Sequence, residues 1–181
     1  MRLFFLFVIC FLPFSISGQI KTEYYKEVNI ENVKNYYSRY SIKIPDSWFS
    51  YYTDPNLMSH SPNKFKDSIS PKKNYPSFII REGFYKSKSN QKSVKFFIKS
   101  QKRRFSNFDY KIEREEHPLY GEYFVVLYKT LSSNNKIEVF FVTILNWNKQ
   151  SYSFFYSSTD NYFDEHFKEV NEIISSFKIS K

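Results

Sequence analysis

Apolar and polar residues alternate along much of the chain, and a period of two is typical of a strand that buries one face. The first such segment is 40–44, where Tyr40, Ile42 and Ile44 are the apolar positions. The same pattern predicts further strands at 48–52, 57–61, 77–85, 110–116, 122–131, 137–147 and 151–157. Short connections join the last four, so we expect these strands to pair antiparallel.

A turn is predicted where the first two strands meet, at Pro45-Asp46-Ser47. Proline fixes φ, and the Asp and Ser side chains can accept hydrogen bonds from nearby backbone N–H groups. We therefore expect the strand that begins at Trp48 to return as the second strand of a hairpin. A tryptophan with apolar neighbours is usually buried, so we interpret Trp48 as a packing residue rather than a ligand contact.

Two later segments place apolar residues at helical spacing instead. In the predicted helix 93–105 the apolar face comprises Val94, Phe97, Ile98 and Phe105. In the predicted helix 160–177 the apolar residues are Phe163, Phe167, Val170, Ile174 and Phe177. A sheet and an amphipathic helix each bury one face against another element, so the chain is predicted to form an α+β sandwich.

The first 18 residues have the pattern of a secretory signal peptide. Arg2 precedes an apolar run at 3–12, and small residues follow. This run is shorter than the roughly 20 residues of a membrane-spanning helix, so we predict no transmembrane span. Cleavage fits after Ser17 or Gly18. We favour Gly18, which makes Gln19 the first residue of a protein exported to the bacterial periplasm or outside the cell.

The predicted leader also contains Cys10, the single cysteine of the sequence, so the exported chain has neither a disulfide nor thiol chemistry. Residues 19–37 are interpreted as a polar N-terminal arm, and 38–181 as one domain. The leader contains one basic residue and no acidic one, so its removal lowers the net charge from +9 to +8. A basic exported protein meets anionic surfaces or acidic partners, whereas export argues against nucleic acid.

Four stretches of the chain resemble the PsbP/Mog1/DcrB-like superfamily. They are YSIKIPDSW (40–48), SVKFFIKSQKRRF (93–105), HPLYGEYFVVLY (117–128) and SYSFFYSSTDNYFDEHFKEVNEIISSFKI (151–179). The resemblance implies a three-layer α/β/α sandwich with a central antiparallel sheet. It also implies a protein without a catalytic motif, which docks on other proteins or assists the assembly of membrane complexes. The segment 64–75 departs from the family by being longer and more basic than a minimal member needs.

Residues that could catalyse a reaction or bind a metal form no recognisable motif. The three histidines lack the spacing of a metal site and are expected at surface or turn positions: His60, His117 and His166. On a strand, Glu113 and Glu115 point away from Glu116, which indicates a solvated surface rather than a pair of catalytic carboxylates. We therefore expect no catalytic residue, metal or cofactor, and a hydrolase with a composite site is the least favoured hypothesis.

Basic residues are concentrated in the loop before residue 76 and in the helix 93–105. The candidate interaction patch comprises Lys64, Lys66, Lys72, Lys73, Lys99, Lys102, Arg103 and Arg104, with Tyr75, Phe84 and Tyr85 as candidate aromatic contacts. If the loop and the helix lie on the same side of the protein, these residues would form one patch that binds another protein or an anionic envelope surface. If they do not, they form two separate solvated faces. The favoured function is a non-catalytic binding or accessory domain. The alternative is a chaperone-like factor that holds apolar client segments in an aromatic-lined cleft.

Overall fold

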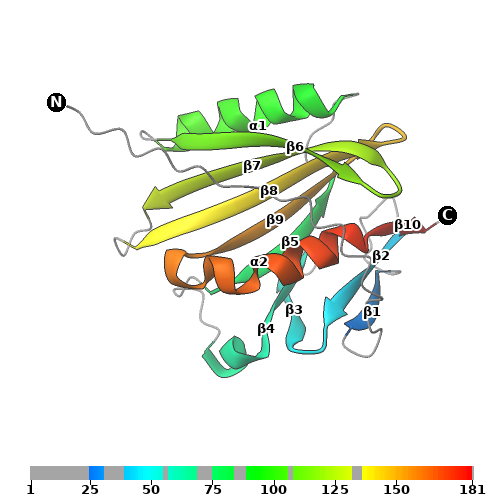
Figure 1. The fold of residues 1–181 in the computed structure, drawn as a ribbon, viewed down its shortest axis with the longest axis vertical. Coiled ribbons are helices and arrows are strands. Elements are labelled where there is room, and N and C mark those ends of the chain that lie inside the picture. Colours follow the sequence, from blue (N-terminus) through cyan, green and yellow to red (C-terminus); the bar gives the residue numbers. More distant parts are fainter. Residues whose placement is uncertain are drawn as a thin grey trace, which may run out of the picture.

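The central feature of the fold is a seven-stranded antiparallel sheet with the order β3-β4-β5-β9-β8-β7-β6 (Figure 1). The computed structural model describes residues 25–30, 39–54, 57–68, 75–83, 89–105, 108–131 and 136–180. The strands of this sheet are β3 (Trp48–Asp54), β4 (Leu57–Pro62), β5 (Ser77–Glu82), β6 (Asp109–His117), β7 (Gly121–Leu131), β8 (Ile137–Trp147) and β9 (Gln150–Thr159). The last four strands pair in sequence, as their short connections predict.

Consecutive residues of a strand point to opposite faces of the sheet, and one helix covers each face. α1 (Asn90–Arg104) lies on one face, where Phe97 shares a buried cluster with Val126 of β7. α2 (Asp160–Ser175) lies on the other face, where Val170 shares a cluster with Val125. The predicted α+β fold, a three-layer α/β/α sandwich around an antiparallel sheet, is therefore confirmed.

Both helices differ from their predicted bounds, α1 mainly at its start and α2 at its end. α1 begins at Asn90 rather than residue 93, because the Ser89 hydroxyl caps it by accepting a hydrogen bond from the backbone N–H of Lys92 at 3.3 Å. α2 ends at Ser175 rather than 177. Phe177 continues the apolar spacing of α2 but lies beyond the helix, where the chain extends into the next strand. Apolar spacing alone cannot show whether Phe177 belongs to the last turn of the helix or to the extended chain that follows it.

The expected hairpin between the first two strands is wrong. β2 (Arg39–Pro45) belongs to a second, three-stranded sheet, in which it pairs with β1 (Tyr25–Ile30) and β10 (Lys178–Ser180). β3 pairs with β4 in the main sheet. The turn after β2 thus leads the chain from one sheet to the other, which lets the apolar residues of β2 join the core beside α2. Alternation shows which face of a strand is buried, but not which strand lies next to it.

Several expectations concern residues outside the described ranges. These are the signal peptide at 1–18 with Cys10, and the candidate contacts Lys72, Lys73, Phe84 and Tyr85. β1 lies within the segment 19–37 that we interpreted as an arm.

Candidate functional site

The described part of the predicted basic patch is divided between the two faces of the sheet. Lys64 and Lys66 lie on the short 3-10 helix η2 (Asn63–Ser68), and the ammonium group of Lys64 pairs with the Glu165 carboxylate of α2. Four members lie on α1, on the opposite face: Lys99, Lys102, Arg103 and Arg104. Loop and helix therefore do not form one surface, because α1 lies on the far side of the sheet from α2 (Figure 1), and α1 carries most of the described patch.

Tyr75 belongs with η2 rather than with α1. Its ring centroid lies 5.1 Å from that of Phe65, which lies 5.2 Å from that of Tyr162 on α2. Phe65 is 7% exposed, so these rings attach η2 to the rest of the protein. Tyr75 is therefore part of a packing contact on the α2 side, away from the basic residues of α1.

The outward side of α1 carries basic residues at spacings of three and four, which place them on one helical face. This basic stripe comprises Lys92, Lys95, Lys99, Lys102 and Arg103, all of them exposed. Phe96 lies within the stripe and is 62% exposed. The inward side of the helix is buried and comprises Ser93, Val94, Phe97 and Gln101. The candidate patch omitted Lys92 and Lys95, although their helical spacing could have identified them.

The positive charge of α1 is not neutralised within the described structure. The helix contains six Lys or Arg residues and no Asp or Glu. None of these six forms an ion pair with another described residue. Lys102 instead lies 5.3 Å from the ring centroid of Tyr110, an aromatic contact that leaves its charge in place. This side of the protein therefore presents a positive field to solvent.

Three acidic residues of α2, in contrast, form ion pairs with lysines. Asp160 pairs with Lys129 at 2.7 Å, and Glu172 lies 4.0 Å from Lys168. Glu165 pairs with Lys64, whose hydrogen bond is the main cause of the lowered pKa of the Glu165 carboxyl. The charged residues of α1 are therefore basic and those of α2 mostly acidic, and the acids of α2 are largely neutralised by ion pairs within the protein.

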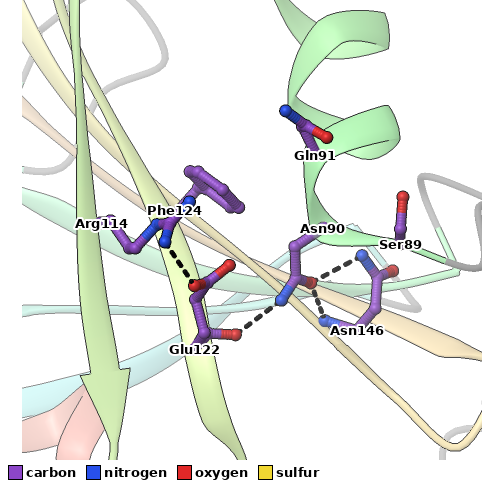
Figure 2. Close-up of a pocket in the computed structure, with 7 residues that line it drawn as sticks. All are labelled: Ser89, Asn90, Gln91, Arg114, Glu122, Phe124 and Asn146. Carbon is purple, nitrogen blue, oxygen red and sulfur yellow. Dashed lines mark hydrogen bonds and ion pairs between the residues drawn. The ribbon is translucent and has the colours of Figure 1, made fainter.

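A polar pocket of about 400 Å³ lies between the first turn of α1 and strands β6, β7 and β8 (Figure 2). Its lining residues are Ser89, Asn90, Gln91, Arg114, Glu122, Phe124 and Asn146. The Asn90 side chain donates to the carbonyl oxygen of Glu122 at 2.6 Å and accepts from the backbone and side-chain amides of Asn146 at 2.6 and 2.8 Å. These bonds hold α1 on the sheet. With one aromatic residue, the pocket does not resemble the aromatic-lined cleft of the chaperone-like alternative.

The three histidines are buried rather than at the surface, which corrects our expectation for them: His60, His117 and His166. The His60 Nδ1 lies 2.8 Å from the Ser50 hydroxyl, and the His166 Nδ1 lies 2.8 Å from the Glu169 carboxylate. Each histidine is held in a different part of the fold. Among the described residues, no group of three His, Cys, Asp or Glu side chains has the arrangement of a metal site.

The acidic cluster of β6 lies on the surface, as the strand pattern predicts. Glu115 and Glu116 are exposed, and Glu113 is half-buried and pairs with Lys111 at 2.5 Å. The arrangement is that of a solvated edge strand whose charges discourage pairing with another sheet.

Comparison with known proteins identifies the fold. The chain is similar to the solution structure of cyanobacterial PsbP (CyanoP) from Synechocystis sp. PCC 6803, with 14% identity, a TM-score of 0.55, and coverage of 93% of this chain and 99% of that one. It is also similar to LpqN, which is involved in cell envelope biogenesis of Mycobacterium tuberculosis, with 11% identity, a TM-score of 0.57, and coverage of 87% and 92%. The chain therefore has a PsbP-like fold. No protein-family model and no curated protein matches its sequence.

Neither helix of the described residues could cross a bilayer. Both are shorter and less apolar than a membrane-spanning segment.

Proposed function

We propose that this chain is an exported, non-catalytic binding domain that docks on an anionic partner in the cell envelope through the basic stripe of α1. The observation that carries the proposal is the contrast between the two outer layers. The acids of α2 are largely paired, whereas the six cations of α1 have no acidic partner among the described residues. Unneutralised charge on a rigid helix attracts an anionic surface at little cost in ordering.

Export is supported by the charged, apolar and small-residue regions of 1–18. A place in the envelope is supported by the similarity in fold to LpqN, whose described role is in cell envelope biogenesis. Because one fold supports many functions, the proposal depends on the basic stripe rather than on the fold alone.

A binding assay with polyglutamate tests the docking surface. The charge variant changes Lys95, Lys99, Lys102 and Arg103 to Gln. The matched control changes four exposed lysines that lie outside α1 to Gln: Lys43, Lys111, Lys149 and Lys178. We expect the charge variant to bind polyglutamate at least about tenfold more weakly than wild type, and the control variant to lose much less affinity. Wild-type binding should vanish at about 1 M NaCl, where the Debye length is about 3 Å. Equal losses in both variants would show that only net charge matters and would refute this docking surface.

Expression of the full sequence in a bacterial host tests export. We expect the protein outside the cytoplasm, and N-terminal sequencing should begin at Gln19, or at Gly18 if cleavage follows Ser17. A chain that stays in the cytoplasm with residues 1–18 attached would contradict the proposed location.

A further inference from the structure

We propose that the anionic partner of the basic stripe is a phospholipid bilayer, and that Phe96 enters the layer between its headgroups and acyl chains. The inference rests on the proposed function, in which α1 binds an anion, and adds the chemical nature of that partner. It is carried by an exposed aromatic side chain in the middle of a cationic helix face.

Phe96 is 62% exposed and lies outside the apolar side of α1, which packs against the sheet and is almost completely buried. Lys92 and Lys99 lie four positions before it and three after it, and Lys95 is adjacent. With 3.6 residues per turn, the ammonium groups of Lys92 and Lys99 lie along the same helix face as the ring, and Lys95 lies at the side of that face. A face that combines one apolar ring with several cations matches the bilayer interface, where phosphate groups lie directly above hydrocarbon.

The position of α1 suits a broad, flat partner. The helix lies on the outside of the sheet (Figure 1), and its 15 residues make a ridge about 22 Å long. The polar pocket lies at its first turn, beside Asn90, and not along the stripe. A flat surface can contact the whole ridge at once, and the described pocket occupies only one end of it.

The buried side of α1 limits how deeply the domain can enter. Val94 and Phe97 are 3% and 0% exposed and pack with the sheet, so the helix cannot turn its apolar side towards lipid without losing the core. Among the residues of α1, Phe96 and the aliphatic stems of the lysines can reach below the headgroups, with the ammonium groups remaining among the phosphates. The domain therefore binds at the surface and does not insert.

The difference in charge between the two outer layers sets the orientation. α2 contains Asp160, Asp164, Glu165, Glu169 and Glu172, against one lysine, Lys168. The negative potential of an anionic leaflet attracts the α1 layer, whose cations have no acidic partner among the described residues, more strongly than the α2 layer, whose acids are largely paired with lysines. The domain thus lies with α1 against the lipid, and its α2 layer faces away from the membrane.

Vesicle co-sedimentation tests the inference with the soluble protein purified from cells that express the full sequence. One set of vesicles contains phosphatidylglycerol and phosphatidylcholine in equal parts, and the other contains phosphatidylcholine alone. We expect binding to the first set and not to the second. Phe96→Ser should weaken binding to the anionic vesicles about tenfold, because the apolar contact is lost, and should leave binding to polyglutamate unchanged. Phe96→Leu, which keeps an apolar side chain, is the matched control and should retain most of the affinity.

A second measurement locates the side chain directly. Tryptophan fluorescence of Phe96→Trp should be quenched by anionic vesicles that contain brominated acyl chains. The wild-type protein, with the buried Trp48 and with Trp147 outside α1, should show little quenching. Equal quenching of the two proteins would show that Phe96 does not enter the bilayer.

The outcomes separate this inference from the proposed function. Binding to polyglutamate without binding to anionic vesicles would overturn the lipid inference and leave an acidic protein or polymer as the partner of α1. Binding to neither would overturn both. Equal vesicle binding by wild-type protein and Phe96→Ser, with the α1 charge variant still impaired, would refute the role of Phe96.

Discussion

The indole Nε1 of Trp48 donates a hydrogen bond to the Glu169 Oε2 at 3.0 Å, which connects the start of β3 with the middle of α2. The same carboxylate accepts from the Ser47 hydroxyl at 3.3 Å and lies 2.8 Å from the His166 Nδ1. Trp48 is 0% exposed, so it is a packing residue, as its apolar surroundings predict. This contact anchors the chain where it passes from one sheet to the other.

Glu169→Ala should destabilise the protein by about 2 kcal/mol, because it removes the carboxylate that accepts hydrogen bonds from the Trp48 Nε1 and the His166 Nδ1 in a partly buried region. Urea unfolding followed by fluorescence measures the change. Glu165→Ala is the matched control one turn away on α2, where the carboxylate is exposed, and it should alter stability little. Equal destabilisation by the two changes would contradict the role assigned to Glu169.

Stability should decrease as the pH falls below about 6.5, because burial lowers the pKa of His117. The backbone N–H of Leu119 donates to its Nδ1 at 3.1 Å, and its Nε2 lies 3.0 Å from the carbonyl oxygen of Ile174. This geometry fits the neutral ring, with the proton on Nε2. A lowered pKa in the folded state means that the unfolded chain binds the proton more readily, so acid favours unfolding.

The difference between wild type and His117→Gln isolates this contribution, because glutamine can donate and accept but does not titrate in this range. Thermal unfolding measured from pH 8 to pH 5 should show a larger loss for wild type than for the variant, mostly below pH 6.5. Parallel curves for the two proteins would exclude His117 as the source of the pH dependence.

Asn90→Ala should destabilise the protein by about 2 kcal/mol, because it removes three hydrogen bonds between α1 and the sheet, two from the amides of Asn146 and one to the Glu122 carbonyl. Chemical denaturation measures the loss. Gln91→Ala, at the exposed neighbouring position, should change stability by less than about 0.5 kcal/mol. Hydrogen exchange should also accelerate in the first turn of α1 for the Asn90 variant, and unchanged protection there would contradict an anchoring role.

Phe177→Ala should lower the free energy of unfolding by about 3–5 kcal/mol, because the ring is 0% exposed and packs in the core between several elements. Its centroid lies 4.9 Å from that of Phe154, 5.0 Å from that of Tyr152 and 5.4 Å from that of Tyr40. Phe96→Ala, which truncates an exposed phenylalanine, should be close to neutral in the same unfolding experiment. A small loss for Phe177→Ala would show that the two sheets are held together by other contacts.

The basic stripe illustrates how far sequence reasoning reaches towards the candidate site. Lys99, Lys102 and Arg103 could be identified because they repeat at helical spacing opposite an apolar face. The sequence pattern could not show that these residues lie far from Lys64, because their separation depends on which face of the sheet each segment covers. Lys64 pairs with Glu165, a residue 101 positions later in the chain, and local pattern contains no information about such a contact.

The sequence by itself determined the strands β2 to β9, the two helices, the α+β class and the basic character of α1, because each of these depends on neighbouring residues and on the burial of one face. The tertiary structure alone decided that β2 pairs with β1 and β10 rather than with β3. It also decided that Phe177 lies beyond α2 and that the histidines are buried with partners. These features depend on which distant segments meet, and alternation or helical spacing can be satisfied equally well by several such pairings.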